Sequence, residues 1–500
     1  MPPLTRRAFT RAAATAAAIP FFPGCNLTSS ARANRSPNAN GILRVAVAGI
    51  RSRGGSHISG FQSLPGVDVV ALVDVDSNVL AQRKAELEKN KASKNGWEGG
   101  EVQGYADLRD ALAREDIDVV SLATPNHLHA IQTIWSCQAG KDVYVEKPVC
   151  HNIFEGRQMV RAAEKYGCLV QTGTQSRSSS GIRDGIAFVH GGGLGKIRYA
   201  HGTCFKPRRS IGKLSEPQAA PEHVDWDLYS GPAPIGPLSR RQLHYDWHWQ
   251  FQTGNGDLGN QGIHQMDMCR WALGVKELAR SVRSIGGRFG YDDDGDTPNS
   301  MVTLLDYDPA PILFEVRGLP RDLEAQEKNW GGSMDRIRSG AVGVTVVCEN
   351  GYLVIPNYNE ATAFDSDGKQ IGKWSGSSNH FANLIEAIRM GDGSLLTAPI
   401  LQGHLSSSLC HMANISYALG ESQSPEQVRE AIAGQEILSS SFERLATHLD
   451  KNGVDLAQFP PVLGAALDLD PSSERFLNSD AANLLRTREY RAPFIVSEKI

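Results

Sequence analysis

The sequence lacks a hydrophobic run long enough to cross a membrane. The apolar stretch near its N-terminus, residues 12–22, is shorter than the roughly 20 residues that a spanning helix needs. Basic stripes are also missing: Lys and Arg occur in short clusters such as Arg208-Arg209, and the formal net charge is −4. Proteins that bind nucleic acid or anionic membranes present such a stripe. We therefore expect no membrane span and no nucleic-acid partner.

Close-spaced metal ligands are absent as well. The eight cysteines, at positions 25, 137, 150, 168, 204, 269, 348 and 410, show no paired spacing of the kind that binds zinc. Several lie in apolar runs, where a buried free thiol is the common state. His264, Asp267, Asp257, His244 and His248 would form a metal site only if the fold gathered them, so we predict none.

Residues 1–33 have the pattern of an export signal. A twin-arginine sequence at residues 5–11 precedes an alanine-rich run and a small-residue cleavage site at residues 31–33. Cys25 is an alternative lipid-attachment site, which Phe22 and Pro23 fit poorly. Because the twin-arginine route carries folded proteins, we expect a periplasmic protein that travels with its cofactor. Residues 34–41 form a polar linker.

Residues 42–175 alternate between buried-strand and helix patterns. Continuous apolar runs bounded by turns are typical of strands in a parallel sheet that is covered on both faces. A chain of 500 residues also exceeds a single core, so a second domain is expected. We predict an α/β fold with an N-terminal Rossmann domain. The expected strands are residues 43–50, 67–73, 119–123, 142–145 and 169–173.

A glycine turn after the first strand predicts a dinucleotide site. Gly49 would form the tight turn, Gly54 would open the helix, and the phosphates would lie at the helix N-terminus. Asp74, at the end of the second strand, has about the spacing of a carboxylate that binds an adenosine ribose, which favours NAD over the alternative, NADP. Arg51 replaces the middle glycine of the usual pattern. The candidate turn contacts are Gly49, Ile50, Arg51, Arg53 and Gly54.

Two later strands also end in polar residues. One is followed by Thr124, Pro125 and Asn126, with His129 soon after, and the other by Glu146-Lys147-Pro148. A doubly wound sheet binds its ligand at the carboxyl ends of its strands. We therefore assign Thr124, Pro125, Asn126, His129, Glu146 and Lys147 to the cofactor site. An ordinary strand-ending turn is the structural alternative for Lys147-Pro148.

Residues 254–271 are rich in glycine and then follow a helical pattern. Asn260, His264, Asp267 and Trp271 fall on one helical stripe, which is polar where a packed helix would be apolar. Such a stripe is either a solvent-exposed face or one wall of an active site.

The rest of the chain predicts a second domain of the α+β class. Residues 176–423 contain several strands with no helices between them, which favours a large, mostly antiparallel open sheet. An insertion at residues 206–253 is rich in Pro, Trp and His, and long loops of this kind are often functional. Residues 424–500 are expected to form a charged, helical tail of no assigned role.

Together these motifs resemble the Gfo/Idh/MocA oxidoreductases, the family of glucose–fructose oxidoreductase and inositol dehydrogenase. The resemblance covers about residues 42–420, and its most specific part is the pairing of Glu146-Lys147-Pro148 with the glycine-rich segment that ends in His264 and Asp267. It implies that Lys147 and His264 face the nicotinamide and the substrate oxygen. It also implies a homodimer or homotetramer, because family members commonly pair through the open sheet. Where the family usually has an Asp, four residues before the His, this chain has Asn260.

Oxidation of a hydroxyl group needs a general base and a group that polarises the oxygen. Each candidate residue suits one of these roles or a supporting one. His264 titrates near neutrality and is the first choice as general base, and burial would lower the pKa of Lys147 toward useful acid–base behaviour. Asn260 exchanges no proton and would orient a neighbour. Asp267 either holds the imidazole or has a structural role, the latter favoured. Candidate substrate contacts are Asp257, His248, Trp249 and Lys206.

Three functions remain open at this point. The leading one is an NAD(P)-dependent oxidoreductase that acts on a sugar, polyol or sugar derivative and recycles a tightly bound cofactor. The second is a redox-neutral glycoside hydrolase or lyase that oxidises its sugar transiently. The third is a non-catalytic carbohydrate-binding relic in which Arg51 blocks the pyrophosphate.

Overall fold

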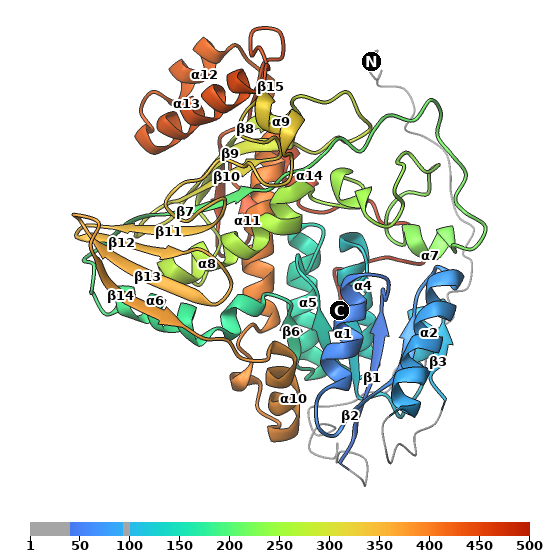
Figure 1. The fold of residues 1–500 in the computed structure, drawn as a ribbon. Coiled ribbons are helices and arrows are strands. Elements are labelled where there is room, and N and C mark those ends of the chain that lie inside the picture. Colours follow the sequence, from blue (N-terminus) through green and yellow to red (C-terminus); the bar gives the residue numbers. More distant parts are fainter. Residues whose placement is uncertain (1–40, 94–100) are drawn as a thin grey trace. The chain divides into compact units, whose positions relative to one another are not determined.

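A six-stranded parallel sheet forms the first layer of the fold (Figure 1). The structure, a computed structural model, describes residues 41–93 and 101–500, so the predicted export signal and Cys25 lie outside the described residues. The strand order is β3-β2-β1-β4-β5-β6, and every pairing is parallel. The predicted Rossmann fold is confirmed. Its strands are β1 (Leu43–Ala48), β2 (Val67–Val73), β3 (Gln103–Tyr105), β4 (Val119–Leu122), β5 (Asp142–Val145) and β6 (Val170–Thr172).

Helices cover both faces of this sheet, as its apolar strands require. Val45 and Val47 of β1 point into one core, whereas Ala46 and Ala48 point into the other. Side chains of α1, α2 and α10 fill the first core, and side chains of α3, α4 and α5 fill the second. These helices are α1 (Arg53–Gln62), α2 (Ser77–Ala92), α3 (Leu108–Leu112), α4 (Asn126–Gln138), α5 (Ile153–Tyr166) and α10 (His380–Met390).

The second layer is a 12-stranded sheet that is antiparallel except where β10 pairs with β7. Its main path runs β14-β13-β12-β11-β7-β10-β9-β8-β16-β15, so the predicted large, mostly antiparallel sheet is also confirmed. The strands of the main body are β7 (Ile197–Phe205), β8 (Ser281–Gly287), β9 (Ser300–Asp306), β10 (Ile312–Arg317), β11 (Val342–Cys348), β12 (Gly351–Ile355), β13 (Glu360–Asp365) and β14 (Gln370–Ser375).

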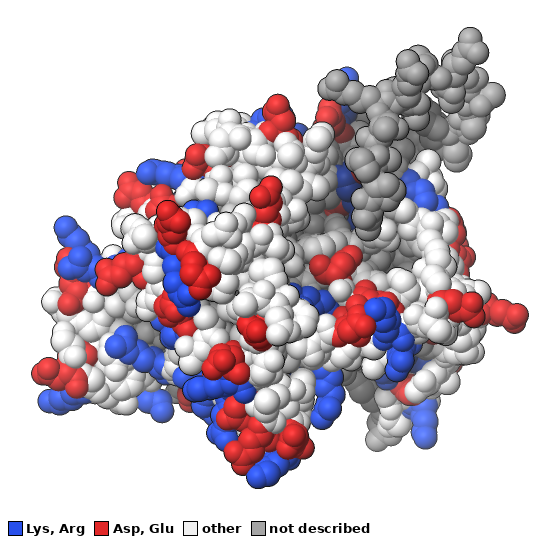
Figure 2. Space-filling view, turned by 90° about the horizontal axis from the view of Figure 1, so that it is seen from above, with Lys and Arg blue, Asp and Glu red and all other residues white. Residues whose placement is uncertain are grey.

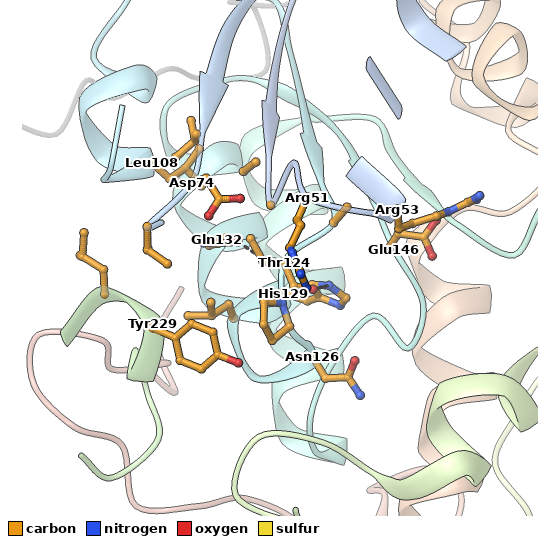
Figure 3. Close-up of a pocket in the computed structure, with 18 of the residues that line it drawn as sticks. Arg51, Arg53, Asp74, Leu108, Thr124, Asn126, His129, Gln132, Glu146 and Tyr229 are labelled. Atoms are coloured by element: carbon orange, nitrogen blue, oxygen red, sulfur yellow. Dashed lines mark hydrogen bonds and ion pairs between the residues drawn. The ribbon is translucent and has the colours of Figure 1, made fainter. Parts of the chain in front are cut away.

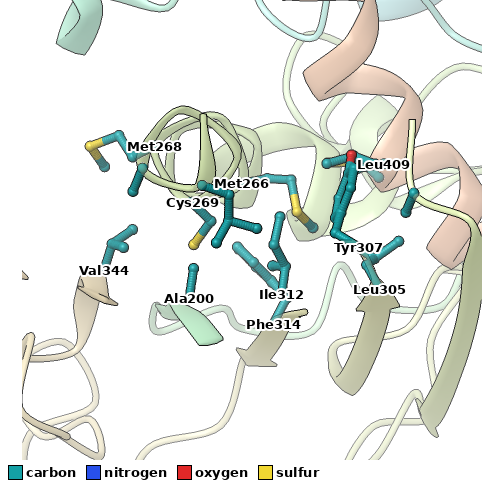
Figure 4. Close-up of a cluster of buried hydrophobic side chains, with 14 of the residues drawn as sticks. Ala200, Met266, Met268, Cys269, Leu305, Tyr307, Ile312, Phe314, Val344 and Leu409 are labelled. Atoms are coloured by element: carbon teal, nitrogen blue, oxygen red, sulfur yellow. The ribbon is translucent and has the colours of Figure 1, made fainter. Parts of the chain in front are cut away.

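One face of the large sheet carries the helix that contains His264. Met266 and Cys269 of α8 (Ile263–Leu273) lie over β7, β9, β10 and β11, where they meet Ala200 and Phe314 (Figure 4). The same core includes Leu409 of α11 (Ile400–Ala418) and side chains of α6 (Ser180–His190). Complete burial of these apolar groups, at about 25 cal/mol per Å² removed from water, fixes α8 on the sheet.

Residues 424–500 differ from the predicted helical tail. They begin with α12 (Pro425–Ile432) and α13 (Glu436–Lys451), which cover part of the other sheet face. They then add strands to the sheet before α14 (Asp480–Leu485), and the last residues return to the parallel sheet, where Val496 joins its core. Figure 1 shows the C-terminus beside that sheet. The added strands are β16 (Val462–Leu463), β17 (Leu467–Asp470) and β18 (Arg475–Phe476), and β16 pairs with β15 (Glu421–Ser422), which precedes α12.

Charged side chains of both signs lie on the surface of the molecule (Figure 2). Figure 2 shows acidic and basic side chains interspersed over the face in view. In the part of the chain that the structure describes, no helix is long and apolar enough to pass through a bilayer. The remaining short helices are α7 (Trp226–Ser230) and α9 (Leu323–Lys328), with 3-10 turns at Gln175–Ser178, Asp246–Trp249 and Gly393–Leu395.

Candidate active site

The turn between β1 and α1 can be built only from glycine at two positions. Gly49 has a φ of +75°, and a Cβ there would lie 2.6 Å from the backbone nitrogen of Thr124. A Cβ on Gly54 would collide with the carbonyl oxygen of Gly49. Arg83 of α2 holds the turn from outside, because its guanidinium donates to the carbonyls of Ile50 (3.1 Å) and Arg51 (2.5 Å). No side chain caps the start of α1, so the positive end of the helix faces the cavity.

Asp74 ends β2 and supports this turn. Its carboxylate accepts the backbone N–H of Ile50 at 2.9 Å and that of Asp76 at 3.0 Å. Burial raises the pKa of the carboxyl, and the two backbone donors oppose that rise. Asp74 also lines the cavity while it holds the glycine turn in shape, and its role as a ribose ligand stays a prediction.

A cavity runs from Asp74 along the carboxyl ends of the parallel strands to Lys147. Figure 3 shows Asp74 and Leu108 at one end and Arg53 and Glu146 at the other, with Arg51, Thr124 and His129 between them. Arg51 is exposed to solvent and lines the cavity. The relic hypothesis, in which Arg51 blocks the pyrophosphate, stays a prediction that a measurement of NAD binding would test. Most of the predicted cofactor residues line the cavity: Gly49, Arg51, Arg53, Asp74, Thr124, Pro125, Asn126, His129, Glu146 and Lys147. Ile50 and Gly54 are buried behind it.

His129 joins two walls of the cavity. Its Nδ1 lies 2.7 Å from the carbonyl oxygen of Pro148, and its Nε2 lies 2.7 Å from that of Thr124. The ring thus ties the end of β4 to the end of β5. Both ring nitrogens are engaged with the backbone, so a cofactor contact of His129, which lines the cavity, would be made by its ring carbons; that contact stays a prediction.

Glu146 is a positioning residue. Its carboxylate accepts from Arg53 Nε at 2.7 Å and lies 3.1 Å from His57 Nε2. These partners hold the pKa of Glu146 well below its usual range in spite of complete burial. The ion pair links the first turn of α1 to the end of β5, so the glycine turn and Lys147 keep a fixed relation.

Lys147 connects the parallel sheet to the glycine-rich segment. Its Nζ donates to the carbonyl oxygen of Asn260 at 2.8 Å, across 113 positions of sequence. Burial lowers the pKa of Lys147, and the neighbouring Arg53 and Lys206 lower it further, while Glu146 opposes them. The two predicted halves of the site therefore meet at one hydrogen bond.

The predicted helical stripe is wrong at its start. Leu258–Gly262 form a π-helical turn, and the α-helix begins only at Ile263, so Asn260 does not share a regular α-helical face with His264. Asn260 acts through its backbone carbonyl, because the wider π turn leaves that oxygen free to accept from Lys147. Its side chain was the predicted orienting group, and the structure gives that function to the main chain.

His264 lies on the first turn of α8 with one ring face near Tyr358, at a centroid separation of 5.1 Å. Its Nδ1 is buried and has no hydrogen-bond partner among the described residues. Burial, with a contribution from Lys147, lowers the pKa of His264 to about 3, so the predicted titration near neutrality is wrong. The imidazole is neutral at physiological pH and is a proton acceptor rather than a cation.

Asp267 belongs to the scaffold rather than to a relay with His264. Both of its oxygens are bound by Arg177, at 2.8 to 3.0 Å, and Ser406 donates to it at 2.6 Å. Its predicted catalytic role is therefore corrected. Through Arg177 and Ser406, Asp267 holds α8 against the segment after β6 and against α11. This fixes the position of His264 relative to the ends of the parallel strands.

Three of the four predicted substrate contacts are internal. Asp257 is completely buried in a bidentate ion pair with Arg208 (2.6 and 2.9 Å). Trp249 is only 2% exposed and packs under the guanidinium of Arg288. His248 is buried, with Nδ1 2.6 Å from the carbonyl oxygen of Tyr245. Lys206, by contrast, remains partly exposed and donates to Gln261 at 2.9 Å.

Comparison with known proteins agrees with this geometry. The family model described as "Oxidoreductase family, NAD-binding Rossmann fold", that of Gfo/Idh/MocA, matches residues 43–174. Residues 43–174 therefore match the NAD-binding Rossmann domain of the Gfo/Idh/MocA oxidoreductase family. The chain is 26% identical to levoglucosan dehydrogenase of Pseudarthrobacter phenanthrenivorans over 245 residues, 48% of this chain and 54% of that protein.

Two other relatives match shorter stretches of the chain. The 4-carboxy-2-hydroxymuconate-6-semialdehyde dehydrogenase of Sphingobium is 28% identical over 37% of this chain and 55% of its own length. A glycosyl hydrolase family 109 protein of Shewanella pealeana is 31% identical over 32% of this chain and 37% of its own length. The chain spans about half the length, or less, of these curated relatives.

Solved structures show the same fold. The WlbA dehydrogenase from Bordetella pertussis, in complex with NADH and UDP-GlcNAcA, has a TM-score of 0.52 and 17% identity, covering 74% of this chain and 96% of its own. Levoglucosan dehydrogenase with NADH and levoglucosan has a TM-score of 0.52 and 16% identity over the same shares. Both are similar to this chain in fold.

The residues at the cavity fit NAD. The turn at Gly49 and Gly54 lets a backbone approach phosphates, and the uncapped start of α1 provides the positive end of a helix. At the other end, Asn126 lines the cavity with a buried Nδ2 that lacks any partner among the described residues. An orphaned amide donor of this kind matches the polar carboxamide that a nicotinamide ring carries.

Several residues of the cavity escaped prediction because they are far away in sequence. Tyr229 and His244 come from the 206–253 insertion, and Phe494 comes from the last residues of the chain. His244 Nε2 lies 2.8 Å from Asp76, which anchors the insertion over the end of β2. The insertion thus contributes aromatic side chains, Tyr229, Tyr245 and Trp247, to the wall of the cavity.

The structure offers no metal centre. Among residues 41–93 and 101–500, no group of three or more His, Cys, Asp or Glu side chains is arranged to hold an ion. The seven described cysteines are free and buried, as expected from their apolar surroundings. His244 instead pairs with Asp76, and Asp257 with Arg208, so these candidate ligands are engaged elsewhere.

Proposed function

We propose that this protein is an NAD-dependent oxidoreductase that acts on a sugar, polyol or sugar derivative and retains its cofactor between turnovers. The observation that carries the proposal is the hydrogen bond from Lys147 to the carbonyl of Asn260. It brings the end of β5, at the cofactor cavity, to the segment that opens α8 and holds His264.

Each side chain has a defined task in this proposal. NAD, when bound, supplies the hydride acceptor. His264, which is neutral and has an unpartnered Nδ1, accepts the proton of the substrate hydroxyl. Lys147 donates a hydrogen bond toward the substrate oxygen and is held in place by Asn260. Glu146 and Asp267 take no part in the proton transfer. They fix the two segments that carry Lys147 and His264.

Retention of the cofactor is supported by elements outside the parallel sheet. Tyr229, His244 and Trp247 of the insertion and Phe494 of the C-terminal segment complete the cavity wall. An exported enzyme with no external supply of nicotinamide would need this enclosure and a reaction that returns the cofactor to its starting state. We propose the periplasm as its location; replacing Arg6 and Arg7 by Lys should leave the protein in the cytoplasmic fraction.

The primary test is chemical identification of the bound molecule. Mass spectrometry of the supernatant after denaturing purified protein should show NAD or NADH. Added candidate sugars should then change the absorbance of reduced nicotinamide. Absence of both a released dinucleotide and binding of added NAD would overturn the proposal.

Variants of the two central residues test the site itself. Lys147→Ala and His264→Ala should each reduce turnover by at least about a hundredfold, the usual contribution of a positioned acid–base group. Bound dinucleotide should remain, because neither side chain holds the glycine turn. Lys369→Ala and His223→Ala, at exposed positions, are the matched controls. Undiminished turnover in both active-site variants would show that the chemistry occurs elsewhere.

A redox-neutral glycoside hydrolase is the second candidate. It is favoured by the match to the family 109 glycosyl hydrolase protein and by Asn260, which replaces the usual Asp. The same Lys147 and His264 would serve a transient oxidation. Release of nitrophenol from aryl glycosides with no net change in nicotinamide absorbance would select this function over a net oxidation.

We also propose that the protein forms a homodimer or homotetramer. Part of the large sheet, around Arg198, Tyr199 and Thr345, is a hollow that α13 covers only from one side. Light scattering of the purified protein would give the number of copies.

A further inference from the structure

The side chains around His264 carry an excess of positive charge. Each buried carboxylate near it has an arginine partner: Glu146 with Arg53, Asp257 with Arg208, and Asp267 with Arg177. These pairs are locally neutral. Lys147 and Lys206 remain, and neither is within ion-pair distance of a carboxylate in the part of the chain that the structure describes.

Lys206 is placed at the site by the fold. It directly follows β7, a central strand of the large sheet, and its backbone N–H donates to the carbonyl of Arg317. Its ammonium lies close enough to Lys147 to lower that residue's pKa. Glu146 and Asp257 act on Lys147 in the opposite direction, but each is already paired with an arginine. An anion beside the two lysines would offset their repulsion further.

A chain of hydrogen bonds orients the ammonium. Lys206 Nζ donates to Gln261 Oε1 at 2.9 Å, and Gln261 Nε2 donates to the hydroxyl of Tyr358 at 2.8 Å. Gln261 adjoins Asn260, and Tyr358 packs against the ring of His264. The three side chains are all partly exposed, so solvent reaches them beside His264.

We infer that Lys206 binds an anionic group of the substrate, and that the substrate is a sugar or polyol derivative carrying a carboxylate or a phosphate. The Lys206 ammonium has three donors and uses one of them on Gln261. The others are free to donate to anionic oxygens, while the Tyr358 hydroxyl provides a neighbouring polar contact. A neutral sugar would bring no negative charge to offset the positive charges of Lys147 and Lys206. This inference rests on the proposed function, because it places the anion beside the hydroxyl that His264 would deprotonate.

Binding to the dinucleotide-loaded protein, measured by calorimetry, tests the inference without requiring turnover. The probes form two matched sets. D-glucose is compared with D-glucuronate and D-glucose 6-phosphate, and D-galactose is compared with D-galacturonate. We expect an anionic member to bind at least about tenfold more tightly than its neutral counterpart, and raised salt to weaken that preference. Preference for the uronates identifies a carboxylate, and preference for the phosphate identifies a phosphate.

Substitutions assign the preference to Lys206. Lys206→Met keeps the aliphatic stem and should remove the tenfold preference, whereas Lys206→Arg should keep most of it. Lys369→Met, on an exposed turn, is the matched control and should behave as the parent. Melting temperatures of all variants verify folding.

Three results would overturn the inference: equal affinities for neutral and anionic probes, a preference that survives in Lys206→Met, or no binding by any anionic probe. The dinucleotide content of the same samples keeps this separate from the proposed function. Protein that holds NAD but shows no anionic preference refutes only the role of Lys206. Protein that holds no NAD refutes the proposed function.

Discussion

At the scale of single residues, the site depends on which polar groups are already satisfied. Asp267, Asp257 and Glu146 are fully engaged by arginines, so they cannot act on a substrate. His264 and Asn126 instead retain buried atoms without partners in the described chain, and such atoms are costly unless a ligand completes them. Unmet hydrogen-bonding capacity is therefore a better guide to function here than residue type.

The low pKa of His264 predicts an unusual dependence of kcat/KM on pH. Its pKa of about 3 means that the proton-accepting form is present above about pH 4, so kcat/KM should show no acid limb near 6.5. Lys147 has a lowered pKa, so loss of its proton should produce an alkaline limb below 10.5. The measurement is kcat/KM from pH 4 to 10 with the best substrate found. An acid limb at pH 6 to 7 that vanishes in His264→Gln would contradict the buried, neutral imidazole.

We expect Asp74 to contribute to NAD binding in two ways, as a ligand of the ribose and as a support of the glycine turn. Asp74→Asn keeps the shape but removes the charge that accepts from Ile50 and Asp76. We expect the Kd for NAD to rise about tenfold or more, the effect of losing a charge-assisted hydrogen bond. Fluorescence titration with NADH measures this, and Asp367→Asn on an exposed turn is the control. Unchanged affinity would remove Asp74 from the cofactor site.

At the scale of elements, the C-terminal segment, residues 424–500, is the main addition to the domain that contains the 12-stranded sheet. Arg491 pairs with Asp227 at 2.6 Å and donates to the carbonyl of Gly231, which ties the segment to the 206–253 insertion. Phe494 packs against Trp135 and Arg109 while lining the cavity. Two elements that are distant in sequence thus form one continuous wall.

Phe494→Ala should accelerate loss of the dinucleotide. Truncation of a buried aromatic ring opens the wall and removes about 3 kcal/mol or more of packing locally. We expect the dissociation rate of NADH, followed by fluorescence after dilution, to rise at least tenfold. Phe459→Ala, at a phenylalanine that is 61% exposed, controls for removal of a ring. An unchanged rate would mean that the segment is only structural.

The strand ends were predictable because the buried strands are continuous apolar runs, and the polar residues that follow them stand out. Lys147 and His264 could be singled out in this way. The ion pair of Asp257 with Arg208 and the contact of Phe494 with Trp135 could not, since each joins positions that share no local pattern. The π turn at Asn260 was missed for a different reason: its hydrogen-bond register leaves no signature in the spacing of apolar residues.

At the scale of the whole molecule, many histidines are buried in a neutral form. Burial lowers the pKa to about 3 for His127, His264 and His411 and to about 4 for His248 and His380. The unfolded chain binds protons at these positions near pH 6.5, whereas the folded chain does not. Stability from these groups is therefore complete above pH 6.5 and is lost as the pH falls toward 3.

The melting temperature should accordingly fall between pH 7 and pH 5. Each such histidine can cost about 2 kcal/mol at pH 5, although Glu155, whose pKa burial raises to about 7, acts in the opposite direction. Calorimetry at pH 7, 6 and 5 measures the slope. His411→Gln should flatten it, and His223→Gln, at a largely exposed position, should not. A melting temperature that rises steadily with acidity would contradict the burial of these rings.

The return of the chain to its first sheet also determines when the cavity can be completed. Synthesis proceeds from the N-terminus, so the strands that bear the glycine turn emerge hundreds of residues before Phe494 and Val496, which contribute to the wall and the core. The pocket is therefore open on one side until these residues have been synthesised. Stable capture of a dinucleotide would have to wait for them, and a chain terminated before Phe494 would be unable to keep it.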